Sequence, residues 1–70
     1  MAAKYEYRKL KGRIIEVYGT RKAFAKALDL SENSLSLKLT GKTNISQEDI
    51  ELWSKLLGID PDEYGSFYFT

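Results

Sequence analysis

A pair of short helices with almost no connection between them sets the strictest limit on the fold. Residues 20–42 read TRKAFAKALDLSENSLSLKLTGK. The apolar spacing predicts one helix over about residues 21–28 and a second over about 32–40, with Asp29-Leu30-Ser31 between them. Helices joined by so few residues cannot lie antiparallel along their lengths, so they must cross at a steep angle. The stretch therefore predicts a helix-turn-helix arrangement.

The rest of the sequence also has helical rather than strand periodicity. Further helices are expected over about residues 5–18 and 47–57, with a short one over 61–65. The prediction is a single compact all-α domain of four to five helices that spans residues 1–70. The expected N-caps are Thr20, Ser31 and Ser46, and the helices are expected to end at Gly19, Gly41 and Gly58.

The chain has no Cys and no His among its 70 residues, so it cannot be stabilised by disulfides or by zinc ligands of those types. A chain of this length buries only about 60% of its unfolded surface, so tight helix packing must supply the stability. The serines lack a plausible base partner, and acids such as Glu48, Asp49 and Glu51 suit a helix start. We therefore expect no enzyme activity, catalytic residue, metal, cofactor or small-molecule substrate.

The net charge of +1 conceals two opposed halves. Up to residue 42, ten Lys and Arg residues stand against four acidic ones, and beyond it one Lys stands against six acids. The basic half is a candidate surface for a polyanion. The alternative is an ordinary solvated surface, which would include Lys9 and Arg13 on the predicted outer side of the first helix.

No membrane segment is expected, because no apolar run approaches the roughly 18 residues that a spanning helix needs. Residues 1–9 also lack the apolar core of a signal peptide. The sequence thus predicts a cytoplasmic protein without a membrane partner.

The outer side of the predicted helix 32–40 is polar but almost uncharged. Leu35 and Leu39 point inward, whereas short polar side chains and Leu37 point outward. Short donors and acceptors suit base edges in a major groove. The stretch matches T-x-x-x-[LF]-A-x-x-L-x-[VL]-S-x-x-[ST]-[LI]-S-x-x-L-x-G. It resembles the phage Cro and lambda-repressor-like helix-turn-helix family (XRE type), and the resemblance covers most of residues 5–58.

This resemblance implies a phage or prophage regulator that binds double-stranded operator DNA sequence-specifically, with a homodimer on DNA as one arrangement. Helix 32–40 would lie in the major groove. Together with the outward face, the resemblance implies base reading by Arg21, Glu32, Asn33, Ser36 and Leu37. It implies phosphate contacts by Thr20, Lys22, Ser34, Thr40, Lys42, Thr43 and Asn44.

Two residues depart from the family pattern. Asp29 stands where relatives often carry Gly, and Asp adopts a left-handed conformation less readily than Gly. Glu32 stands where many relatives carry Gln or Arg, and its carboxylate can accept from a cytosine amine but repels phosphates. The alternative function is therefore an antirepressor that binds a partner repressor protein. A net charge near zero and an expected exposed Leu52 also favour this alternative.

The C-terminal residues GSFYFT contain three consecutive aromatic side chains. The Gly-Ser pair is expected to end any fifth helix and to leave an aromatic tail over residues 66–70. In an extended tail, Phe67 and Phe69 point one way and Tyr68 the other. Phe67 and Phe69 are then expected to cover Leu52 and Leu56, either within one chain or across a dimer or partner surface. The alternative is a tail that completes the monomer's own core.

Overall fold

The chain folds into five α-helices and one short 3₁₀ segment in a computed structural model that describes residues 6–69. No strand occurs within these residues, so the predicted all-α fold class is confirmed. The elements are α1 (Arg8–Tyr18), α2 (Arg21–Ala27), α3 (Glu32–Leu39), α4 (Gln47–Leu57), η1 (Pro61–Glu63) and α5 (Tyr64–Tyr68).

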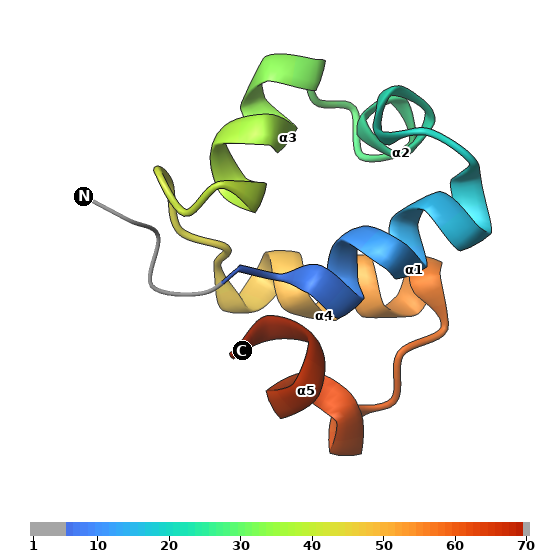
Figure 1. Ribbon diagram of the computed structural model, residues 1–70, viewed down its shortest axis with the longest axis vertical. Helices are drawn as coiled ribbons and strands as arrows, with labels where there is room; N and C mark the ends of the chain where they lie inside the picture. The colour runs from blue at the N-terminus through green and yellow to red at the C-terminus, as the bar shows by residue number, and fades with distance from the viewer. Residues whose placement is uncertain (1–5, 70) are drawn as a thin grey trace.

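The helices form two groups on either side of a central pair (Figure 1). Helices α1 and α4 lie in the middle, α2 and α3 lie on one side of them, and α5 lies on the other. The Cα radius of gyration is 11.0 Å, which is close to the ~11 Å expected of a folded domain of this length. The α2–α3 pair is therefore held at one end of the molecule, away from α5.

The core is built around three aromatic rings from three different helices. The ring centroids of Phe24 and Trp53 lie 5.5 Å apart in an edge-on arrangement, and those of Tyr18 and Phe24 lie 5.1 Å apart. Such contacts add to the burial of the rings themselves. Phe24 and Trp53 are fully buried and Tyr18 is partly buried. The fully buried aliphatic side chains of the core are Leu10, Ile14, Leu35 and Leu39.

Polar caps mark the helix starts that the sequence predicts. Thr20 accepts the backbone N–H bond that opens α2, and Ser31 does the same for α3. Ser46 and Asp49 form a reciprocal capping box at the start of α4, which satisfies two backbone N–H groups that the helix leaves unpaired. Gly58 ends α4 in a left-handed conformation with φ 68°.

Three helix ends differ from the predicted bounds. Helix α1 begins at Arg8 instead of residue 5, because Tyr7 adopts a left-handed conformation with φ 56° and interrupts the helical path. Helices α2 and α3 each end one residue early, with Leu28 and Thr40 as C-caps. Residues 5 and 70, the outer limits of the predicted first helix and tail, lie outside the described residues.

The prediction of a non-helical aromatic tail is wrong. Helix α5 continues through Gly65, and both Phe67 and Tyr68 are buried. Adjacent residues on a helix lie about 100° apart, so both can enter the corner between α1 and α4. The Tyr68 hydroxyl lies 2.9 Å from Ser54 Oγ on α4, and burial raises the pKa of Tyr68 above its usual value. Burial of two aromatic side chains outweighs the cost of about 1 kcal/mol for a Gly inside a helix.

The predicted dimer or partner surface is also not formed as a unit. Phe67 is 3% exposed and belongs to the core of the monomer, whereas Leu56 is half-buried against that core. Leu52 and Phe69 remain exposed, at 47% and 52%. The tail therefore completes the monomer's own core, which was the alternative to docking on Leu52 and Leu56.

Asp29 holds the left-handed conformation that the α2–α3 turn requires, with φ 58°. We expect Asp29→Gly to raise the free energy of unfolding by about 0.5–1 kcal/mol, because Gly adopts this conformation without a Cβ clash. Asp29→Ala keeps the Cβ, and Ala adopts the left-handed conformation less readily than Asp does, so this variant should lower stability. Urea unfolding of both variants measures the difference, and a loss of stability in both would show that the turn stores no strain.

Candidate functional site

The turn between α2 and α3 is bounded by a backbone hydrogen bond at the end of α2 and by a side-chain cap at the start of α3. The Leu30 N–H donates to the carbonyl of Ala25 at 2.9 Å, and the Ser34 N–H donates to Ser31 Oγ at 3.1 Å. Ala25 is 2% exposed, and its small side chain leaves room for the chain that follows α2. The two contacts fix the path of the chain out of α2 and the start of α3.

The predicted base-reading residues share the outer side of this helix pair. Arg21, Glu32 and Asn33 are exposed, whereas Ser36 and Leu37 are half-buried. The side chains of Asn33 and Ser36 form no hydrogen bond with another described residue. Their polar groups can therefore bind an external partner.

Three of the predicted phosphate contacts already take part in internal hydrogen bonds. The Thr40 hydroxyl donates to the carbonyl of Ser36 at 2.9 Å, and a hydroxyl has only one proton to donate. Thr20 accepts a capping bond, and Ser34 accepts from Ser31 at 2.9 Å, so these two keep their own protons for a ligand. Thr40 would have to give up its internal bond to reach a phosphate as a donor.

The turn after α3 directs its backbone towards the protein. The amides of Lys42 and Thr43 both donate to the carbonyl of Leu37, at 3.0 and 3.2 Å. These N–H groups therefore complete the end of α3 and do not point at a ligand. The side chains of Lys42, Thr43 and Asn44 are exposed, and they are what this turn can offer to a phosphate.

An ion pair that sequence reasoning missed joins α3 to α4. Lys38 Nζ lies 2.7 Å from Asp49 Oδ2, and both side chains are mostly buried. Burial alone would raise the pKa of Asp49. The hydrogen bonds from Lys38 and Ser46, with the charge of Lys38, outweigh burial and lower this pKa below its usual 3.8. Lys38 flanks the buried stripe of Leu35 and Leu39, which is the signal that could have indicated its role.

The Lys38–Asp49 pair should stabilise the protein in a pH-dependent way. The folded pKa of Asp49 is lowered, so the contribution is complete above pH 3.8 and is lost as the pH falls through the folded pKa. We expect Lys38→Met to lower the free energy of unfolding by about 1 kcal/mol at pH 7. Urea unfolding from pH 7 down to about pH 2 should show the loss shrinking in acid. An equal loss at every pH would exclude the ion pair as its cause.

Arg13 joins three helices at the opposite end of the molecule from α2 and α3. Its Nη1 atom donates to the carbonyls of Leu57 and Gly58, at 2.8 and 3.3 Å, and so satisfies the end of α4. Its guanidinium also lies 5.0 Å from the ring centroid of Phe67, and Lys9 Nζ lies at the same distance. The expectation that Arg13 simply faces solvent is therefore wrong.

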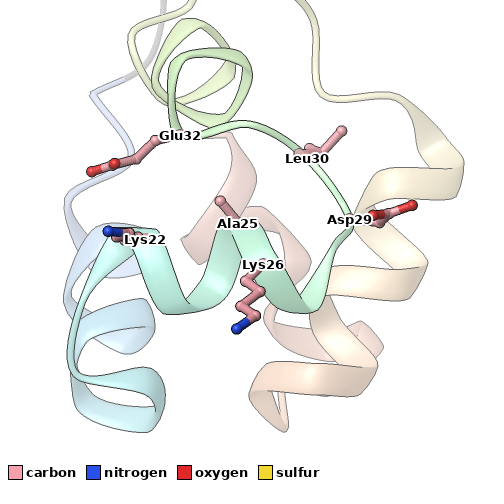
Figure 2. A pocket seen from close by; sticks show the side chains of 6 residues that line it. All are labelled: Lys22, Ala25, Lys26, Asp29, Leu30 and Glu32. Atoms are coloured by element: carbon pink, nitrogen blue, oxygen red, sulfur yellow. The ribbon is translucent and has the colours of Figure 1, made fainter.

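A surface pocket of about 310 Å³ lies between α2 and the start of α3. Figure 2 shows the Ala25 methyl between the two elements, with Lys22 and Glu32 extending to one side of the view and Asp29 to the other. No ion pair or hydrogen bond joins its charged side chains to another described residue. The pocket is lined by Lys22, Ala25, Lys26, Asp29, Leu30 and Glu32.

Across residues 6–69, no group of three or more His, Cys, Asp or Glu side chains is placed to hold a metal ion. None of the helices in this part of the chain has the length and apolar character needed to cross a membrane.

Comparisons with known proteins show that the chain is similar to a phage regulator. Residues 1–70 match the family described as "Protein of unknown function (DUF739)". No match was found among curated proteins. Among solved structures, the chain is similar to the solution structure of the modulator of repression (MOR) of the temperate bacteriophage TP901-1 from Lactococcus lactis. The sequence identity is 34% and the TM-score is 0.85, and the match covers 96% of this chain and 90% of that one.

Proposed function

The chain belongs to the DUF739 family, and from this membership and its likeness to the modulator of repression we propose that it is a phage regulator that binds a partner repressor. The observation that carries the proposal is that likeness, which extends over nearly the whole chain. By binding the repressor, the protein would change how much operator DNA the repressor occupies. Its expected place of action is the bacterial cytoplasm.

The distribution of cations supports a protein partner over DNA. The affinity of a protein for DNA grows with the number of phosphates that its Lys and Arg side chains neutralise. In this chain, Arg13 and Lys38 are engaged with carbonyl or carboxylate groups, and Lys9 lies over an aromatic ring. The exposed cations near α2 and α3 that have no such internal contact are Arg21, Lys22, Lys26 and Lys42.

The acidic groups beside α2 and α3 support the same proposal. Glu32 and Asp29 line the pocket together with two lysines, and a polyanion would be repelled by both carboxylates. The turn amides after α3 and the Thr40 hydroxyl are engaged inside the protein. A protein surface can offer cations as well as anions, so it suits this mixture better than a phosphate backbone does.

Direct, sequence-specific DNA binding of the Cro type remains the second candidate. The outer side of α3 favours it, because Asn33 and Ser36 keep hydrogen-bonding groups that base edges could use. Membership of the Cro and lambda-repressor-like family, and a homodimer on DNA, stay predictions.

A mobility-shift experiment with the purified repressor encoded in the same genome, and its operator duplex, tests the proposal. We expect the chain to bind the repressor and to change the fraction of operator that the repressor occupies, while binding the duplex alone no better than random DNA. The control is an unrelated repressor with its own operator, which should be unaffected.

The opposite pattern would support the second candidate. A chain that prefers the operator over random DNA at low salt, and leaves the repressor unbound, acts by reading DNA itself. Its affinity should then fall steeply with salt, because neutralised phosphates release counterions.

A further inference from the structure

The pocket between α2 and α3 has a rim of mixed charge, with two cations on α2 and two carboxylates beyond its end, and the proposed function does not yet use it. Lys22 and Lys26 lie one helical turn apart on α2, while Asp29 and Glu32 belong to the turn and to the start of α3. All four side chains are exposed and have no charged partner within the described residues. Each is thus available to pair with an opposite charge from outside.

The position of this rim is set by the protein itself. The Leu30–Ala25 backbone bond fixes the path of the chain out of α2, and the Ser31 cap fixes the start of α3. The backbone around the pocket is therefore already placed, and only the charged side chains lose conformational freedom on association. Lys22 and Glu32 are ten residues apart in sequence, yet both line the same pocket and extend to one side of it (Figure 2).

We propose that this pocket is the docking site for a segment of the partner repressor that carries acidic and basic side chains next to each other. The inference rests on the proposed function and names the surface that performs it. The lining carries two cations and two carboxylates, so an occupant of only one sign would meet repulsion as well as attraction. The half-buried Leu30 supplies apolar contact for the stems of the incoming side chains.

The experiment must test which sign stands at each position of the pocket while the net charge of the pocket stays the same. The double variant Lys22→Glu with Glu32→Lys keeps the net charge of the chain and of the pocket but exchanges the signs at two positions. The matched control is Glu51→Lys with Lys55→Glu, an exposed pair of the same composition on α4. Thermal unfolding first establishes that both variants fold.

The affinity for the purified repressor encoded in the same genome is then measured by calorimetry for each folded protein. We expect the pocket swap to weaken binding at least tenfold, because like charges then face each other across the interface, and we expect the control swap to change it less than twofold. Tight binding by the native chain that survives the pocket swap would overturn the docking site and leave the proposed function standing.

Two further outcomes also decide the matter. If the native chain itself does not bind the repressor, the proposed function fails, and the docking site fails with it. If the pocket swap leaves repressor binding unchanged but alters affinity for operator duplex at low salt, the pocket contacts DNA and the inference is wrong.

Discussion

Phe67→Ala is expected to lower the free energy of unfolding by about 3–5 kcal/mol. Phe67 is 3% exposed and fills the corner between α1 and α4 beneath Lys9 and Arg13, so its removal leaves a cavity among fixed helices. A domain of this length has a total stability of roughly 4–10 kcal/mol. The variant should therefore be close to unfolding at room temperature, which urea or thermal unfolding would measure.

Phe69→Ala is the matched control for this prediction. The Phe69 side chain is 52% exposed and lies two residues further along the same tail. Its loss should cost about 1 kcal/mol or less. If the two variants lost similar amounts, Phe67 would not be part of the monomer's core, and docking of the tail on a second chain would again need to be considered.

Arg13→Ala is expected to lower the free energy of unfolding by about 2–3 kcal/mol. The change removes a charged donor from two carbonyls at the end of α4 and also removes the guanidinium above Phe67. Arg13→Lys should recover only part of the loss, because an ammonium lacks the planar fork of donors and stacks less well on a ring.

Lys9→Ala provides the comparison for Arg13, because it removes only a cation above the same ring. A contact of this kind at an exposed site contributes about 0.5–1 kcal/mol. Urea unfolding of Arg13→Ala, Arg13→Lys and Lys9→Ala separates the contribution of the carbonyl hydrogen bonds from that of the cation above the ring. Equal losses for Arg13→Ala and Lys9→Ala would show that the bonds to the α4 carbonyls add nothing.

The helix starts were predictable because the signals are local. Ser31 and Ser46 each cap the helix that begins one residue later, and such a bond depends on only four consecutive residues. The left-handed conformation at Asp29 was instead implied by the resemblance to a family whose members often carry Gly there. Local signals therefore predicted where α3 and α4 begin.

The roles of Arg13 and Lys38 were not predictable in the same way. Arg13 binds carbonyls at residues 57 and 58, and Lys38 binds a carboxylate on the next helix, so both partners depend on tertiary packing. A short fifth helix was predicted over residues 61–65, but its extension to Tyr68 was missed, because the gain from burying Phe67 and Tyr68 appears only when α1 and α4 are already in place.

The choice of partner is the least predictable property of all. The same α2–α3 geometry can present side chains to a DNA groove or to a protein, so function follows from the side chains at the site and not from the fold. Here the informative side chains are Glu32, whose carboxylate departs from the Gln or Arg of many relatives, and Asp29, which departs from their Gly in the turn. Their common pocket became visible only in the structure.

The participation of Phe67 and Tyr68 in the core has a consequence for synthesis on the ribosome. The core joins side chains from residue 7 to residue 68, so a nascent chain cannot complete it until residue 68 has left the exit tunnel. Until then, the apolar stripes of α1 and α4 are accessible to chaperones and proteases. A chain cut short before residue 67 would thus lack two buried aromatic side chains and would keep this apolar surface exposed.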